Sequence, residues 1–150
     1  MSFPPAPPLP HASQPVSGPS GPRATFWQRV GAILIDGVML AVIDFVLKAI
    51  SPSLGYLGIL VGLAYFTYFE GGPTGQTIGK RIVGIRVYDF AQGGPIGYGR
   101  GVLRYLGRIV STIPCLLGYF WMLWDKEKQT WHDKIATTVV VPVSSYPVQP

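Results

Sequence analysis

The residues of this chain that could do chemistry are charged side chains placed inside apolar segments. Asp36 and Asp44 stand in the run from Phe26 to Leu47, which after Val30 is otherwise apolar apart from two glycines. A carboxylate inside a membrane helix costs roughly 2.5–3.5 kcal/mol on insertion scales, so it needs a partner or a task. Arg29 precedes Asp36 by seven residues, or two helical turns, so both side chains project from nearly the same face. We expect Arg29 and Asp36 to interact, and protonation of such a carboxylate could couple to ion passage.

A second charged pattern lies further along the chain. Arginines recur every fourth residue between Tyr98 and Ser111, at positions 100, 104 and 108, and apolar residues fill the other faces. This pattern predicts an amphipathic basic helix, which suits the membrane interface better than the bilayer interior. Two interpretations stand: the arginines only anchor the helix to lipid headgroups, or Arg104 turns inward to meet an aspartate.

Other chemistries find little support in the sequence. His132 stands alone, without the spacing of a nucleophilic triad or a metal site, and the single cysteine, Cys115, excludes an internal disulfide. The stretch Gly75–Arg81 looks like the end of a phosphate-binding loop, but it lacks the first glycine and the final Ser or Thr. The net charge is +5, yet the basic residues lie between apolar segments rather than along a soluble basic stripe. We therefore expect no enzyme activity, no cofactor and no nucleic-acid partner.

The composition places these charges in an integral membrane protein. Of the 150 residues, 48% are hydrophobic and 13% are charged, well below the charged share of soluble domains. Two apolar runs predict spanning helices over about residues 28–49 and 54–70, joined as an antiparallel hairpin by Ser51–Ser53. Gly58 and Gly62 in the second run form a small-xxx-small pair, which predicts close packing against another helix.

The helical segment 98–124 decides the topology. Hydropathy alone makes its second half a third span, but Pro114 interrupts the run, and the apolar residues after it cover only about half a bilayer as a helix. Two short stretches rich in β-branched residues, Ile82–Tyr88 and Thr137–Val143, predict strands that need a pairing partner. Pairing requires both strands to lie on one side of the membrane. We therefore expect 98–124 to enter and return as a re-entrant or interfacial segment that turns near Pro114.

The basic residues also predict an orientation. They concentrate before the first helix and in the loop from Glu70 to Arg108, so both the N-terminus and this loop should be cytoplasmic. Residues 1–22 predict a disordered Pro-rich tail without a signal-peptide pattern, residues 23–143 a membrane domain, and residues 144–150 a frayed tail. The predicted fold class is an all-α membrane protein: a two-span helical hairpin, a re-entrant or interfacial helical segment and a small cytoplasmic β-hairpin.

These motifs, in this order, resemble the RDD family of bacterial membrane proteins, which is named for one arginine and two aspartates. Arg29 and Asp36 match the arginine at the start of the first helix and the aspartate inside it. The resemblance implies that the second aspartate is Asp133, in the stretch HDK, with Asp44 as the competitor. It also matches the glycine-rich stretch GQTIGKR, where Gly75 and Gly79 are expected to serve the backbone conformation, and the later Arg104. The Pro-rich tail resembles that of proline-rich-antigen-like members.

Membership of this family implies a multi-pass protein of the bacterial plasma membrane, and its members are generally described as probable transporters. Two functions from different classes remain open. In the first, Arg29, Asp36 and Asp133, joined by Arg104 and Asp44, form a proton or cation pathway with an ion as substrate. In the second, these charges are a structural clasp in a non-catalytic scaffold or assembly partner. In both cases the partners are the lipid bilayer and a second copy or another membrane protein.

Overall fold

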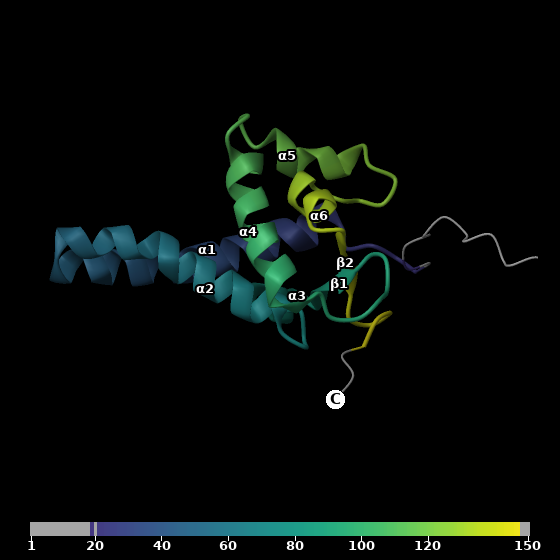
Figure 1. The fold of residues 1–150 in the computed structure, drawn as a ribbon, viewed down its shortest axis with the longest axis horizontal. Coiled ribbons are helices and arrows are strands. Elements are labelled where there is room, and N and C mark those ends of the chain that lie inside the picture. The colour runs from purple at the N-terminus through teal and green to yellow at the C-terminus, as the bar shows by residue number, and fades with distance from the viewer. Residues whose placement is uncertain (1–18, 20, 148–150) are drawn as a thin grey trace, which may run out of the picture.

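The computed structural model describes residue 19 and residues 21–147 of the chain (Figure 1). The tail predicted for residues 1–22 lies almost entirely outside the described residues, as do the last residues of the predicted tail 144–150. In chain order the elements are α1 (Phe26–Ile50), η1 (Pro52–Tyr56), α2 (Leu57–Gly71), α3 (Ile78–Val83), β1 (Ile85–Asp89), α4 (Gly97–Thr112), α5 (Leu117–Phe120), η2 (Trp121–Leu123), α6 (Trp131–Ile135) and β2 (Thr138–Pro142).

The two apolar runs form helices α1 and α2, and in Figure 1 they project together away from the other elements. The α1 helix begins at a capping box in which Thr25 and Gln28 satisfy each other's backbone groups, and it ends at Ser51. Phe26–Ile50 and Pro52–Gly71 are both long and apolar enough to cross a membrane, which confirms the two predicted membrane helices. Large apolar side chains on the projecting part are exposed, including Val38, Phe45 and Ile59. Lipid is the solvent that such a surface requires.

Helix α4 crosses the α1–α2 hairpin in Figure 1, with α5 and α6 at one end. The chain then bends by 113° between Gly97–Thr112 and Leu117–Leu123, so the two pieces are either one broken span or a re-entrant loop. Pro114 lies in this bend, and the next two residues adopt left-handed backbone angles, with φ of 50° at Cys115 and 65° at Leu116. A straight third helix through this segment is therefore absent.

The two strands pair antiparallel, from Ile85 opposite Pro142 to Asp89 opposite Thr138, which confirms the small two-stranded sheet. The first strand begins three residues later than predicted, because Thr77 caps a short helix and Gly84 ends that helix with a φ of 76°. The second strand, β2, begins one residue later than predicted, at Thr138, after the short helix α6. Because α4, α5 and α6 separate β1 from β2, the strands are a long-range pair and not a hairpin joined by a turn.

The buried apolar core lies where the sheet meets α1. Ile85, Val87 and Val140 are almost completely buried, together with Ala24 and Ala32. The backbone N–H of Ala24 donates to the carbonyl of Val140 at 2.9 Å, so the segment before α1 is tied to the sheet. This core fixes the start of α1 against the rest of the chain, and the polar site lies next to it.

Helices α2 and α4 approach each other through glycines other than the predicted pair. A Cβ on Gly71 would lie 2.7 Å from the Cα of Tyr98, and a Cβ on Gly101 would lie 3.0 Å from the carbonyl of Thr67. Gly62 faces the Tyr105 hydroxyl of α4, while Gly58 faces the Asp44 carboxylate of α1. The predicted pair therefore accommodates side chains from two different helices, and Gly71 and Gly101 allow the close backbone contact.

Candidate functional site: a buried ion network beside an apolar pocket

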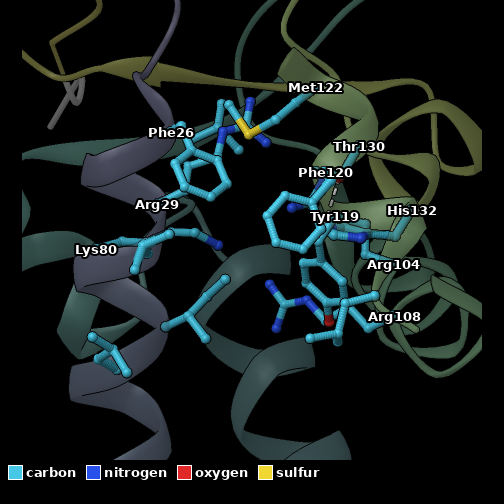
Figure 2. A pocket seen from close by; sticks show the side chains of 15 residues that line it. Phe26, Arg29, Lys80, Arg104, Arg108, Tyr119, Phe120, Met122, Thr130 and His132 are labelled. Carbon is cyan, nitrogen blue, oxygen red and sulfur yellow. Dashed lines mark hydrogen bonds between the residues drawn. The ribbon is translucent and has the colours of Figure 1, made fainter. Parts of the chain in front are cut away.

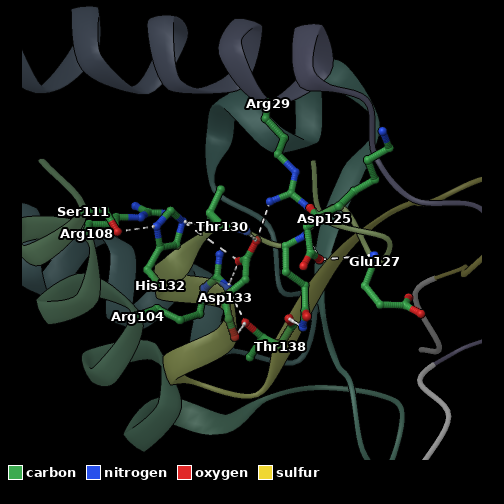
Figure 3. A network of polar contacts seen from close by, with 12 residues as sticks. Arg29, Arg104, Arg108, Ser111, Asp125, Glu127, Thr130, His132, Asp133 and Thr138 are labelled. Carbon is green, nitrogen blue, oxygen red and sulfur yellow. Dashed lines mark hydrogen bonds and ion pairs between the residues drawn. The ribbon is translucent and has the colours of Figure 1, made fainter. Parts of the chain in front are cut away.

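Asp133 is the fully buried carboxylate at the centre of one half of the network (Figure 3). It lies in the first turn of α6, where it and Thr130 form a capping box, and it accepts a hydrogen bond from the backbone N–H of Thr130 at 3.1 Å. Its Oδ2 accepts from Arg29 Nη1 at 2.5 Å, and its Oδ1 accepts from Arg104 Nη1. Burial raises the pKa of the Asp133 carboxyl, but Arg104 and Arg29 outweigh burial and hold this pKa well below its ordinary value. Asp133 is therefore ionised at neutral pH.

Glu70, in the last turn of α2, is the carboxylate of the other half. It is completely buried and pairs with Lys80 from α3 and with Arg104 and Arg108 from α4. The distance from Arg104 Nε to Glu70 Oε2 is 2.9 Å. The sequence predicted Glu70 only as the end of the second span and the start of the following loop, and this role was missed. The sequence feature that could have indicated it is an acidic residue at the end of a long uncharged run. Such a residue needs a cationic partner once it is buried.

Arg104 joins the two halves. Its side chain is 1% exposed, and it donates to Glu70 through Nε and to Asp133 and the Thr138 hydroxyl through Nη1. Of the two interpretations of the basic helix, the inward-facing arginine is the one that the structure contains. Because the partners come from α2, α6 and β2, this one guanidinium contacts three elements besides its own helix.

Asp36 is not paired with Arg29, contrary to the expectation from their shared helix face. Two helical turns separate their Cα atoms by about 11 Å along the axis. Arg29 instead turns toward α6, where it binds Asp133 and the carbonyl of Lys128, the latter at 2.6 Å. Asp36 accepts hydrogen bonds from the Tyr65 hydroxyl at 2.7 Å, the Thr77 hydroxyl at 2.6 Å and the Gly79 N–H at 2.7 Å. It therefore connects α1 to α2 and to the start of α3.

The glycine-rich stretch serves this contact through its backbone. A Cβ on Gly79 would clash with the carbonyl of Ala32, so only glycine lets α3 approach α1 closely enough for its N–H to reach Asp36. Gly75 has a φ of 63° and its carbonyl accepts from the Val87 N–H at 2.8 Å. The donors of this stretch, the Thr77 hydroxyl and the Gly79 N–H, thus bind the carboxylate of Asp36.

Asp44 lies apart from the network. It pairs with Lys48, one turn later on α1, at 2.6 Å, and both side chains are substantially exposed. Of the two candidates for the second aspartate of the motif, Asp133 is therefore the one that the structure places with Arg29 and Arg104, and Asp44 is not part of the group.

Two further titratable groups border the network. Burial lowers the pKa of Lys80, Glu70 opposes this effect, and Arg108 and Arg104 reinforce it, so that the pKa is about 8. Burial also holds the pKa of His132 well below 6.5, although Asp133 acts in the opposite direction. His132 Nε2 lies 2.9 Å from the Thr130 hydroxyl. At neutral pH we therefore describe His132 as a neutral imidazole and Lys80 as the network cation that most readily releases a proton.

A cavity of about 290 Å³ lies beside the network, between α1 and the segment that contains α4, α5 and α6 (Figure 2). In Figure 2, Phe26 and Lys80 lie on one side of it, and Tyr119, Phe120 and Arg108 on the other. Most of its wall is apolar, and its four charged lining residues are all cations: Arg29, Lys80, Arg104 and Arg108. The two carboxylates of the network do not line the cavity.

The ionisable groups of the described residues form ion pairs rather than a cluster of metal ligands. Among the residues that the structure describes, no group of three histidine, cysteine or acidic side chains could hold a metal ion. Each buried carboxylate of the network is neutralised by at least two cations, so neither is well placed to accept a proton near neutral pH.

Comparison with known proteins supports the resemblance drawn from the motifs. The model of the RDD family matches residues 23–137. The chain is 40% identical over 87 residues to a protein named proline-rich antigen from Mycobacterium leprae, covering 56% of this chain and 35% of that protein. It is 41% identical over 85 residues to a proline-rich antigen homolog from Mycobacterium tuberculosis strain H37Rv, covering 55% and 35% of the two chains.

The chain thus spans about a third of the length of these two antigens. It is also 26% identical over 147 residues to the protein YxaI of Bacillus subtilis, covering 79% of this chain and 96% of that one. No solved structure matches the chain. The family match covers most of the sequence and includes Arg29, Asp36, Arg104 and Asp133, and the chain belongs to the RDD family.

Proposed function

We propose that this protein is a non-catalytic membrane scaffold whose buried ion network is a structural clasp. The observation that carries this proposal is the pairing of each carboxylate in the network with two or three buried or half-buried cations that come from two other elements. Asp133 joins α6 to α1 and α4, and Glu70 joins α2 to α3 and α4. Breaking such a pair leaves an uncompensated buried charge, which opposes separation of the elements.

The clasp would attach a folded cap to one end of the membrane hairpin. The sheet, α3 and α6 form the cap, and Arg29 and Glu70 belong to the two membrane helices. We place the cap and the N-terminus in the cytoplasm of a bacterial cell, with the hairpin in the plasma membrane and 98–124 as a re-entrant or interfacial segment. The exposed apolar surface of the hairpin would contact lipid and a second copy or another membrane protein.

A second candidate is proton-coupled cation transport, and two observations favour it. Asp36 is a carboxylate inside a membrane helix that has three neutral donors and no cationic partner among the described residues. Lys80 lies three residues after Thr77, one of the donors to Asp36, and its pKa of about 8 allows proton release near physiological pH. Intramembrane carboxylates are frequent parts of ion pathways. Against this candidate, the cavity beside the network is lined by cations, which repel a cation substrate.

Ion flux measured in proteoliposomes separates the two functions. We expect no cation-driven proton flux from the wild type, and we expect Asp133→Asn to lower thermal stability because Arg29 and Arg104 lose a shared partner. Cation-dependent flux that Asp36→Asn abolishes and Asp44→Asn leaves intact would overturn the scaffold in favour of transport. Asp44→Asn is the matched control, because it removes a carboxylate from the same helix outside the network.

A further inference from the structure

The cavity beside the network is lined by more positive charge than a structural clasp requires. Of the six ionised groups in the network, the four cations line the cavity and the two carboxylates do not. Four positive charges share two negative ones, so the cavity has a surplus of positive charge. In a poorly solvated site this surplus favours an anion.

Several hydrogen-bond donors at this cavity are also left without a protein partner. Arg29 Nε is buried and unpaired among the described residues. Arg108 hydrogen-bonds Glu70 through Nη2 alone, and Arg104 uses only Nε and Nη1 toward protein atoms in the described part of the chain. Of these donors only Arg29 Nε is fully buried, and buried donors are nearly always satisfied in native proteins. A guanidinium fork such as that of Arg104 or Arg108 matches the oxygens of a phosphate.

The remaining wall indicates what is attached to the anion. On the α1 side the cavity is lined by Val30, Ile33 and Leu34, and on the other side by Leu116, Tyr119 and Phe120. Ile33 is 47% exposed and Leu34 is 63% exposed, so the mouth opens on an apolar face of a helix that is long enough to span the membrane. A molecule that enters from this side comes from the lipid phase. A soluble anion would have to cross an apolar mouth.

We propose that this cavity binds the phosphate of an anionic phospholipid, with the first part of one acyl chain against α1 and α5. Arg108 and Lys80 contact the phosphate oxygens, and Arg29 and Arg104 add to the positive field. At about 290 Å³, the cavity is at the small end of ligand sites, so it holds a headgroup phosphate and a short piece of chain rather than a whole lipid. A lipid site goes beyond the proposed scaffold role, because the ion pairs of the clasp hold the cap on the membrane helices without any ligand.

Thermal unfolding of the detergent-purified full chain, titrated with soluble short-chain lipids, tests this site. Dihexanoyl phosphatidylglycerol is expected to raise the melting temperature in a saturable way. Dihexanoyl phosphatidylcholine and inorganic phosphate, each alone, are expected to have little effect. Equal shifts from the two lipids would mean non-specific solvation of the apolar surface and would overturn the proposal. A full shift from inorganic phosphate would overturn the lipid as occupant and leave a free anion, and no shift from any probe would overturn the site.

Two variants with matched controls locate the binding. Arg108→Gln removes one cation from the cavity and is expected to weaken phosphatidylglycerol binding about tenfold, whereas Arg81→Gln, an exposed residue of α3, should leave it unchanged. Because Arg108 also pairs with Glu70, a second variant tests the site without touching the network. Ile33→Phe narrows the mouth, and Val38→Phe places the same aromatic side chain at an exposed position further along α1. Equal binding by Ile33→Phe and Val38→Phe would place the lipid elsewhere and overturn the proposal.

Discussion

The replacement Glu70→Gln is the sharpest test of the clasp, because Glu70 is completely buried and three cations share it. Glutamine keeps the size of the side chain and removes the charge. Arg104 retains Asp133 as a partner, whereas Lys80, with a side chain only 7% exposed, loses its one carboxylate contact among the described residues. Leaving a buried charge uncompensated costs about 3–5 kcal/mol, a large part of the 5–15 kcal/mol by which a typical domain is stable.

For a chain of this length, each kcal/mol lost from the free energy of unfolding lowers the melting temperature by about 2–4 °C. Glu70→Gln should therefore lower the melting temperature by roughly 6–20 °C. The measurement is thermal unfolding in detergent, with Asp44→Asn as the control. Asp44 pairs with Lys48 at the exposed side of α1, and such a pair contributes only about 0.3–0.5 kcal/mol. Similar shifts for the two variants would refute the reasoning that buried pairing holds the cap.

The loss of stability in Glu70→Gln should depend on the charge of Lys80, and this gives a second, independent test. Glu70→Gln leaves both Lys80 and Arg108 without a carboxylate, and Lys80 is the more buried of the two. Adding Lys80→Met removes this cation, so the double variant should be more stable than Glu70→Gln. The effect of Glu70→Gln should also be smaller above about pH 8 than at neutral pH. In the wild type, where Glu70 opposes the effect of burial, the Lys80 pKa is about 8, so above this pH the amine is neutral in both proteins and needs no counter-charge. A double variant that is less stable than Glu70→Gln would contradict this account.

Three other predictions follow from the same geometry. Asp36→Ala should lower the melting temperature more than Asp44→Ala does, because the three donors of Tyr65, Thr77 and Gly79 lose their acceptor. Equal shifts of the two variants in thermal unfolding would show that the hydrogen bonds of Asp36 do not stabilise the fold. The free energy of unfolding should fall as the pH drops below about 6.5, because the unfolded chain then binds a proton at His132 that the folded chain, with its lowered pKa, does not. His132→Gln should flatten this part of the pH profile, and an unchanged profile would assign the effect to other groups. For the topology, Ser145→Cys in a Cys115→Ser background should resist a membrane-impermeant maleimide in intact cells, and labelling there would place the sheet outside.

Hydropathy predicted the membrane helices well because the free energy of lipid solvation depends on composition over many residues, and α1 and α2 are long and uniform. The strand pair was also readable, since β-branched residues fill most of β2 and a lone strand leaves backbone groups unpaired. The boundaries were less accurate. Gly84 ends α3 with a positive φ, and the Thr130–Asp133 capping box starts α6, yet both signals involve only a few residues.

The pairing of the charges could be predicted only in part. Arg29 and Asp36 share a helix face, which suggested that they bind each other. A shared face means that two side chains point the same way, but it does not make them close along the helix axis, and two turns separate these residues. Their true partners lie on elements far away in the sequence: Asp133 is 104 residues from Arg29, and Thr77 is 41 residues from Asp36. Glu70 was missed for the same reason, since its three cations are supplied by later elements whose packing the sequence does not state.

The position of the network along the hairpin bears on what it can do. Arg29 is in the first turn of α1 and Glu70 is in the last turn of α2, so in this antiparallel pair both lie at the same end of the membrane helices. Charges near the end of a span cost less than charges at the bilayer centre. Asp36 reaches deepest, about 15 Å from the start of α1, and the next carboxylate, Asp44, is bound to Lys48 at the exposed far half of the helix. Among the described residues, the hairpin thus has no continuous series of ionisable groups along its length, which agrees better with the proposed anchor for the cap and the proposed lipid phosphate site than with an ion path.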